Sequence, residues 1–274
     1  MVWFDNSDVP PGDITGTGVR IDMSMSEKLN NVRQSAFAEN FKTIAYALLI
    51  ALVIRALFFQ PFNIPSGSMK PTLLIGDYLF VSKFSYGYSK HSLPFSPPIF
   101  DGRLFARTPH RGDVVVFKVP TDNRTDFIKR LIGLPGDKIQ MKHGVLYING
   151  TAVPRVRVED FVRRDELGNV QRIPQYRETL PNGISYNTLD LIDESVTDNT
   201  GVYVVPPDHY FFMGDNRDNS NDSRVQSAVG FVPYENLVGK AQTIFFSTDG
   251  SAHFWQVWRW PSSIRWDRIF SWVG

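Results

Sequence analysis

One apolar segment, residues 41–59, constrains what this chain can fold into more than any other feature. It contains neither Gly nor Pro, and Arg55 is its only charged residue after Lys42. A helix of about 20 apolar residues spans the hydrocarbon core of a bilayer, and residues 41–60 just reach that length. Arg55 lies near enough to one end for its guanidinium to snorkel into the interface. The segment therefore predicts one transmembrane helix, with a buried core helix as the alternative.

A cleaved secretory signal is a second alternative for this segment. Such a signal needs small residues at a cleavage site after the apolar run. Here the run ends in Phe58-Phe59-Gln60-Pro61, so the sequence favours an anchor that is retained.

The charges before the anchor predict its orientation. Lys28, Arg33 and Lys42 precede the apolar run, and positive charge favours the cytoplasmic side. We therefore expect residues 1–40, which are polar, to form a flexible cytoplasmic tail. Residues 61–274 would then lie outside the cytoplasm.

The composition argues against several functions. A net charge of +1 gives no electrostatic bias toward nucleic acid, so we expect no nucleic-acid partner. The absence of Cys excludes a disulfide framework, a thiol nucleophile and Cys-bound zinc. The five His residues show no HxxxH or HExxH spacing, so we expect neither a metal nor another cofactor.

The sequence after the anchor is typical of a mainly β fold. Residues 138–150 predict a hairpin that turns near His143-Gly144, followed by a second turn at Asn149-Gly150. Residues 151–201 are more polar, and we expect an inserted subdomain at about 143–207. Other short apolar runs bounded by Gly and Pro predict strands: residues 78–82, 113–119, 201–205, 209–213 and 241–246.

A tight turn follows the anchor directly. Residues 64–77 contain Pro65, Ser66, Gly67 and Ser68 in succession, and such a cluster predicts a turn that exposes a short side chain. The pattern is not the GxSxG elbow of an α/β hydrolase, because Met and Lys follow the second serine. By itself it is also what an ordinary turn looks like.

A lysine among apolar residues could activate this serine. Lys129 lies in the stretch Asp126-Phe-Ile-Lys-Arg-Leu-Ile-Gly133 and would alternate with its neighbours on a strand. Most lysines are simply exposed. Burial, however, disfavours the charged form and lowers the pKa, and a neutral lysine amine can serve as general base for a serine.

The third informative stretch, residues 213–224, is dense in Asp, Asn and Ser. A calcium loop that begins at Asp218 is one alternative. It would need Gly at its sixth position and Glu at its twelfth, where this chain has Ser223 and Val229. A turn-rich polar loop is therefore the better interpretation.

Together these stretches, with Arg111-Gly-Asp113, resemble bacterial type I signal peptidases. The resemblance extends from the anchor through Pro65–Thr72, Phe127–Arg130 and Gly214–Ser220 to Gly230–Pro233. It implies an antiparallel coiled-sheet catalytic domain of the type shared with self-cleaving repressors, preceded by one transmembrane helix. It also implies an inner-membrane endopeptidase, facing the periplasm, that removes signal peptides from exported preproteins. Its expected partners are those preproteins, the lipid bilayer and the nearby export machinery.

The resemblance carries roles over to single positions. Ser68 matches the nucleophile and Lys129 the general base, while Ser66 and the Ser68 backbone N–H match the oxyanion donors. The remaining matches are of two kinds. Positions that orient the lysine or support the site are Ser220, Asp215, Asp222, Arg224 and Arg130. Positions that line the substrate cleft are Phe62, Ile64, Met69, Leu73, Val116, Phe127 and Ile128.

Two departures and two rival functions remain. Many relatives have two transmembrane segments, whereas this sequence predicts one, and the loop 225–229 is longer than in the shorter family versions. The first rival function is a self-cleaving repressor. It would need a DNA-binding helix-turn-helix, which residues 1–40 do not offer. A membrane-tethered β-domain that only binds peptides would need neither Ser68 nor Lys129.

The C-terminal segment combines tryptophan with arginine. Five of the six Trp residues follow residue 254, and Arg259, Arg265 and Arg268 are interleaved with them. This combination suits a membrane interface, where guanidinium groups meet lipid phosphate. Ordinary core aromatics are the alternative.

Overall fold

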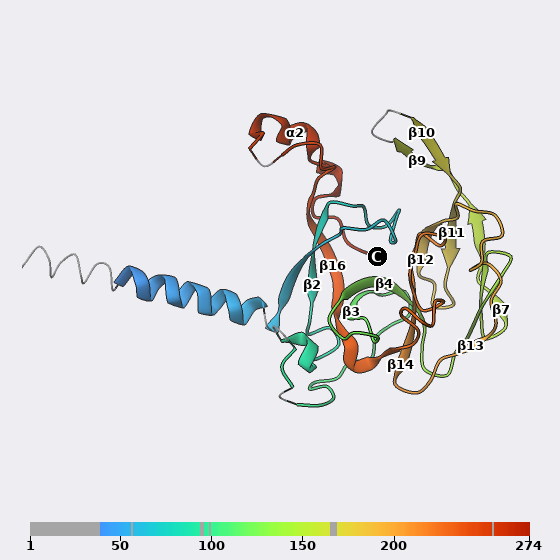
Figure 1. The fold of residues 1–274 in the computed structure, drawn as a ribbon, viewed down its shortest axis with the longest axis horizontal. Helices are drawn as coiled ribbons and strands as arrows, with labels where there is room; N and C mark the ends of the chain where they lie inside the picture. Colours follow the sequence, from blue (N-terminus) through green and yellow to red (C-terminus); the bar gives the residue numbers. More distant parts are fainter. Residues whose placement is uncertain (1–38, 56, 94–95, 99, 165–168, 254) are drawn as a thin grey trace, which may run out of the picture. The chain divides into compact units, whose positions relative to one another are not determined.

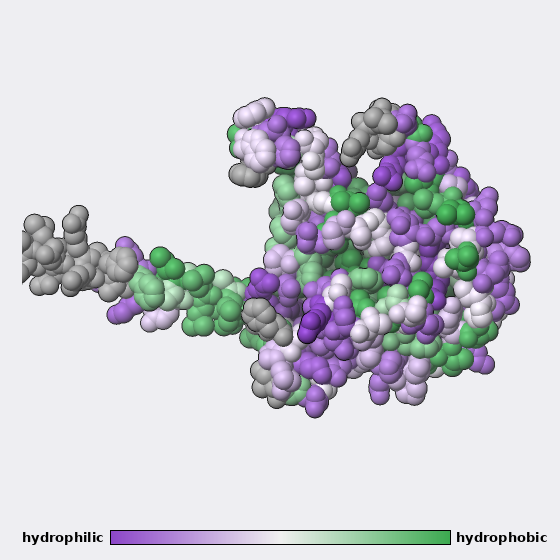
Figure 2. Space-filling view, viewed as in Figure 1, coloured by the Kyte–Doolittle hydropathy of each residue, from purple (hydrophilic) through white to green (hydrophobic). Residues whose placement is uncertain are grey.

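The computed structural model describes residues 39–55, 57–93, 96–98, 100–164, 169–253 and 255–274. The expected cytoplasmic tail therefore lies almost wholly outside the described residues. Residues 39–55 form a helix whose side chains are mostly apolar (Figure 2). Among the described residues, no helix is both long and apolar enough to cross a membrane. The chain divides into two compact units, Met1–Leu52 and Val53–Gly274, and the candidate site belongs to the second.

A seven-stranded sheet forms the framework of the second unit (Figure 1). All its neighbouring strands pair antiparallel. Register shifts interrupt the pairing of β16 with both of its neighbours, and such bulges increase the bend and twist of a strand. In spatial order the strands are β1 (Phe59–Asn63), β2 (Asp77–Ser82), β16 (Leu237–Ser247), β3 (Val114–Lys118), β4 (Asp126–Gly133), β14 (His209–Met213) and β15 (Val232–Pro233).

The side chains of this sheet follow the two-residue period of a strand. On β2, Leu79 and Val81 are buried while Tyr78 and Phe80 are exposed, so one face packs on the core and the other does not. On β3, by contrast, residues 114–117 are all buried, because both faces of this central strand are covered. The expected strands at residues 78–82, 113–119, 209–213 and 241–246 are confirmed within one or two residues, except that β16 begins earlier.

The chain between β4 and β14 forms three smaller sheets. Since β4 and β14 are neighbours, this insert leaves and re-enters the large sheet at adjacent positions (Figure 1). A four-stranded sheet has the order β13-β5-β6-β7, a three-stranded sheet β12-β11-β8, and β9 pairs with β10. Their bounds are β5 (Lys138–Lys142), β6 (Val145–Ile148), β7 (Thr151–Ala152), β8 (Arg155–Arg157), β9 (Phe161–Arg164), β10 (Val170–Ile173), β11 (Gln175–Thr179), β12 (Ser185–Leu189) and β13 (Tyr203–Val204).

The predicted hairpin at residues 138–150 is confirmed. β5 pairs with β6 across His143 and Gly144, and β6 pairs with β7 across Asn149 and Gly150. All four turn residues have positive φ, a region where Gly is unstrained and Asn is tolerated. The single-turn helical elements are η1 (Lys90–Ser92), η2 (Tyr234–Asn236), η3 (Val257–Arg259), α2 (Trp260–Ser263) and η4 (Trp266–Arg268).

Candidate active site

The Ser68 turn follows β1 and is held by the loop that follows β14. The backbone amide of Asn216 donates to the Ser68 carbonyl oxygen at 3.0 Å. The Asn216 side-chain amide donates to the Gly67 carbonyl oxygen, also at 3.0 Å. Gly214 permits this approach, because a Cβ there would lie 2.6 Å from the Ser68 carbonyl oxygen. The turn thus keeps Ser68 in one place, with only 7% of the residue exposed.

Lys129 extends from β4 toward this serine. It pairs with Val115 in the centre of the sheet and is only 4% exposed. Its Nζ lies 2.7 Å from Ser68 Oγ, within the range expected of a nucleophile and its base. The amine also donates to the Ile128 carbonyl oxygen at 3.0 Å. The Phe127 ring lies 5.1 Å from Nζ.

Burial changes the protonation of Lys129. Desolvation lowers the pKa of its amine to about 8, although the charges of Asp222 and Asp215 act in the opposite direction. A neutral amine has two hydrogens and one lone pair. One hydrogen can serve the Ile128 carbonyl, which leaves the lone pair free to accept the Ser68 hydroxyl proton. The surroundings thus hold the amine beside Ser68 and lower its pKa toward neutral pH, as a general base requires.

Each of the two carboxylates near Lys129 is bound to an arginine. Arg224 donates to both oxygens of Asp222 at 2.9 Å. Burial alone would raise the pKa of Asp222, but the Arg224 guanidinium lowers it below its ordinary value. Arg130 donates to Asp215 at 2.9 and 2.7 Å. Because each carboxylate has its own cation, neither depends on a charged Lys129 for a partner.

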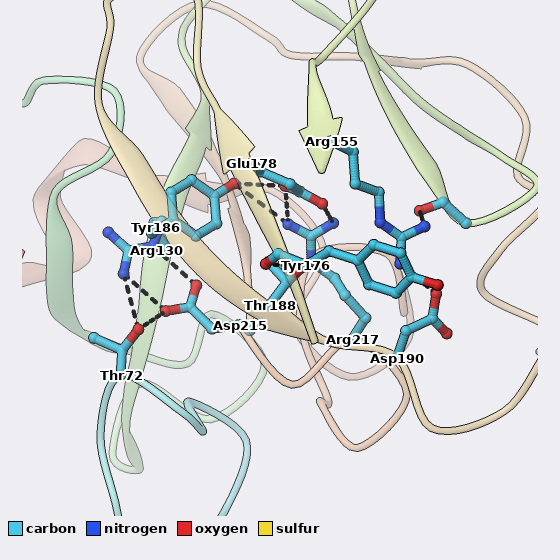
Figure 3. A network of polar contacts seen from close by, with 12 residues as sticks. Thr72, Arg130, Arg155, Tyr176, Glu178, Tyr186, Thr188, Asp190, Asp215 and Arg217 are labelled. Atoms are coloured by element: carbon cyan, nitrogen blue, oxygen red, sulfur yellow. Dashed lines mark hydrogen bonds and ion pairs between the residues drawn. The ribbon is translucent and has the colours of Figure 1, made fainter. Parts of the chain in front are cut away.

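Arg130 connects the site to the insert (Figure 3). The Arg130 side chain is fully buried, and its guanidinium lies 4.1 Å from the centre of the Tyr186 ring. The Tyr186 hydroxyl donates to Glu178 at 3.0 Å, and Arg217 binds Glu178 through two hydrogen bonds of 2.8 and 2.6 Å. Two strands of the insert, β11 and β12, therefore support the loop that holds the Ser68 turn.

Two of the expected hydroxyls lie beside the dyad in different ways. Ser66 Oγ is 3.4 Å from Ser68 Oγ, so it borders the position where the nucleophile reacts. Ser220 Oγ is buried and makes no hydrogen bond of good geometry to any described residue. It lies near enough to Asp222 to contribute to the lowered pKa of that carboxyl. The structure shows no hydrogen bond between Ser220 and Lys129, whose amine donates to the Ile128 carbonyl oxygen, and the lysine-orienting role of Ser220 stays a prediction.

A cavity of about 640 Å³ opens beside the dyad. Among the expected lining residues, Phe62, Ile64, Val116, Phe127 and Ile128 border it together with Ser66, Ser68 and Lys129. Met69 and Leu73 do not line it. Both are fully buried in the same cluster as Ile64 and Val116, so they support the wall from behind rather than form it.

Some residues of the site were not found by sequence reasoning. Asn216 and Gly214 lie in the polar loop 213–224 that the sequence analysis identified. The glycine at position 214 could have indicated that another segment packs closely against this loop. Thr72, whose hydroxyl donates to Asp215 at 2.5 Å, is the last residue of the serine motif, but the motif did not indicate this role. Glu178 and Tyr186 gave no sequence signal, because their role depends on packing between segments far apart in the chain.

A group of three carboxylates includes Asp218, which also borders the cavity beside the dyad. Oxygens of Asp190, Asp198 and Asp218 come within 4.8 Å of one another. Arg155 pairs with Asp190, and backbone amides donate to the other two. Protein groups thus bind one oxygen of each carboxylate, whereas Asp190 Oδ1 and Asp218 Oδ1 are buried and accept no hydrogen bond from the described residues.

Comparisons with known proteins identify the family of this chain. The family model "Signal peptidase, peptidase S26" matches residues 37–246. Signal peptidase I of Rickettsia typhi is 45% identical over 260 residues, covering 88% of this chain and 96% of that protein. Signal peptidase I of Rickettsia prowazekii is 45% identical over 251 residues, covering 85% and 92%. The crystal structure of a signal peptidase I from Enterococcus faecalis V583 is 30% identical, covers 49% of this chain and 97% of that chain, and gives a TM-score of 0.28.

A serine hydroxyl held against a buried amine, beside an open cleft, is the arrangement of a peptidase, and the chain is a serine peptidase. More particularly, it belongs to the signal peptidase family, peptidase S26.

Proposed function

We propose that this protein is a membrane-anchored endopeptidase that removes N-terminal signal peptides from exported preproteins, with Ser68 as nucleophile and Lys129 as general base. The observation that carries the proposal is the 2.7 Å separation of Lys129 Nζ and Ser68 Oγ. Burial of the amine, with a pKa of about 8, supports the same roles. The names of the family and of the Rickettsia relatives support the substrate class.

The dyad acts in two stages. The neutral Lys129 amine accepts the Ser68 proton while Oγ attacks the scissile carbonyl carbon. The Ser66 hydroxyl and the Ser68 backbone N–H donate to the developing oxyanion. The charged Lys129 then returns its proton to the leaving amine, and an ester remains on Ser68. A water molecule then loses a proton to Lys129 and attacks the ester carbon. The bond to Ser68 Oγ breaks, Lys129 returns the proton to Ser68, and the signal peptide leaves as a carboxylic acid.

The cleft suits an extended peptide with small side chains. Its walls come from the end of β1 and the start of β4, so a substrate strand can lie along them by β-augmentation. Because Phe62, Val116 and Ile128 form an apolar wall with a packed core behind it, small residues such as the Ala-x-Ala end of a signal peptide fit best.

The apolar segment 41–60 is the proposed anchor in the inner membrane, with the catalytic region on the periplasmic side near the export machinery. The exposed Leu48, Ile50 and Ile54 side chains support a lipid-facing helix. This topology places the C-terminus outside the cytoplasm, so a reporter fused after Gly274 should show activity there and none inside the cell. Activity of that reporter inside the cytoplasm would exclude this topology.

The decisive experiment is cleavage of a purified preprotein by the full chain. We expect the wild type to release the mature protein, and Ser68→Ala and Lys129→Ala to release none. Ser251→Ala and Lys138→Ala change exposed residues of the same types and should cleave normally. Wild-type activity in either dyad variant would refute the assigned roles, whereas an inactive wild type would refute the proposed substrate.

A further inference from the structure

Two C-terminal arginines bind a buried carboxylate next to the nucleophile turn instead of facing lipid. Arg265 and Arg268 come from the segment whose arginines were expected at a membrane interface. Arg268 donates to both oxygens of Asp77, at 3.1 and 2.6 Å, and Arg265 Nη1 lies 3.7 Å from the same carboxylate. Asp77 is fully buried. The interface interpretation therefore does not fit these two arginines, although Trp258, Trp266 and Trp272 are exposed.

Asp77 closes the loop that begins at Ser68. Its side chain accepts from the Leu74 backbone amide at 2.8 Å and from the Ser247 hydroxyl at 2.6 Å. With Arg268 added, both carboxylate oxygens have two donors each. Arg265 makes no hydrogen bond to Asp77 at 3.7 Å, so loss of Arg268 would leave this buried carboxylate without its hydrogen-bonded cation and destabilise the loop.

Arg268 also reaches the loop backbone directly. Its Nη2 donates to the Thr72 carbonyl oxygen at 2.9 Å, across 196 positions of sequence. On the other side of Thr72, the hydroxyl donates to Asp215 at 2.5 Å and accepts from Arg130 at 3.3 Å. Thr72 is thus fixed between the C-terminal segment and the ion pair next to Lys129.

We propose that Arg268 is a positioning residue for the peptidase reaction: by holding Thr72 and Asp77 it keeps Ser68 within hydrogen-bonding reach of Lys129. This proposal rests on the proposed function, which supplies the preprotein as the natural substrate of the reaction. The C-terminal segment is in this view part of the active-site support. A shift of about 1 Å between reacting groups can reduce a rate about a hundredfold, so a remote contact can control turnover.

The test uses the full chain with Arg268→Gln. We expect kcat on a preprotein to fall about 10- to 100-fold, with KM within about twofold, because the cleft walls at Phe62 and Ile128 are not touched. Arg268→Lys keeps the charge opposite Asp77 but cannot bind Asp77 and the Thr72 carbonyl in the same way. It should therefore recover part of the lost kcat.

Arg103→Gln is the matched control for simple loss of stability. Arg103 donates to the Gly87, Tyr234 and Leu237 carbonyls, and no hydrogen bond or ion pair of the described residues joins it to the dyad or to Thr72. Thermal unfolding gives the folded fraction of each variant. We expect Arg103→Gln to keep its kcat per folded molecule. If Arg268→Gln also keeps its kcat per folded molecule, Arg268 has only a structural role. The same conclusion follows if kcat per folded molecule falls equally in both variants.

A second readout separates this proposal from the proposed function. A small activated ester that acylates Ser68 tests the dyad without any preprotein, and mass spectrometry reports the rate. Slower acylation in Arg268→Gln is expected even if the wild type fails to cleave a preprotein. An unchanged acylation rate would overturn the positioning role.

Discussion

The Asn216 backbone amide and the Ser68 carbonyl oxygen form a 3.0 Å hydrogen bond that joins the polar loop after β14 to the nucleophile turn. The Asn216 side chain adds a second bond to Gly67. Because Asp215 and Asp222 belong to the same loop, the segment that fixes the serine also carries the carboxylates that act on the Lys129 pKa. The position of Ser68 and the pKa of Lys129 therefore both depend on this one loop.

Gly214→Ala should damage the site through this loop. An alanine Cβ would lie 2.2 Å from Ser220 Oγ and 2.6 Å from the Ser68 carbonyl oxygen, so the nucleophile turn must move. We expect kcat to fall at least about tenfold and the melting temperature to drop. Gly201→Ala is the control, since no atom lies within 4 Å of a Cβ there. Equal kinetics in the two variants would contradict the close packing described here.

Ser66→Ala tests the second hydroxyl beside the nucleophile. Removal of one oxyanion donor typically lowers kcat about 10²- to 10³-fold, or about 2.7–4 kcal/mol. KM should change little, because the donor acts on charge that develops in the transition state. Ser66→Thr keeps a hydroxyl and should retain more activity. A kcat within twofold of wild type for Ser66→Ala would remove Ser66 from the oxyanion site.

The pH dependence of kcat should follow the Lys129 amine. Burial lowers its pKa to about 8, and the base works only when neutral, so kcat should rise with pH and level off above about 8. Measurement from pH 6 to 10 under conditions where chemistry limits the rate tests this. A flat profile over that range would rule out a titrating lysine base.

The same pKa predicts a stability effect. Between about pH 8 and the ordinary lysine pKa near 10.5, the unfolded chain binds more protons than the folded chain, so the free energy of unfolding should rise with pH there. Lys129→Met removes this group. The wild-type stability relative to that variant should therefore increase across the window. No change in the difference would indicate that Lys129 titrates normally when folded.

Asp215→Ala should destabilise the fold itself. It leaves the fully buried Arg130 without its carboxylate, and breaking a buried ion pair typically costs about 3–5 kcal/mol. Denaturant unfolding measures the loss. Asp160→Ala removes the partner of Arg157 in a more exposed pair and should change stability by at most about 1 kcal/mol. Similar losses for the two variants would contradict the special role of the buried pair.

The parts of the fold that were predictable are those governed by local pattern. The hairpin at residues 138–150 follows from alternating side chains and from two turns that favour Gly and Asn. The proximity of Ser68 and Lys129 was expected from the family resemblance carried by three motifs in joint order, since none of the three was sufficient alone. Local alternation also placed Lys129 on a strand, where it pairs with Val115.

The parts that were not predictable depend on contacts between distant segments. The strands of residues 151–189 are short, and many of their side chains are exposed, so apolar alternation gave no signal. Two examples are the stacking of the Arg130 guanidinium on the Tyr186 ring and the hydrogen bond from Arg268 to the Thr72 carbonyl oxygen. Met69 and Leu73 lie in the same core cluster as Ile64 and Val116, which a motif match does not reveal.

The adjacency of β4 and β14 has a consequence for where relatives of this chain can differ in length. An insert whose two ends sit on neighbouring strands can grow or shrink during evolution without disturbing their pairing. Here, however, β11 and β12 supply Glu178 and Tyr186 to the site, whereas β9 and β10, among the strands that the structure describes, pair with no strand but each other. Natural deletions should therefore remove the β9–β10 arm first, and keep the β11–β12 hairpin wherever Arg130 and Arg217 are kept.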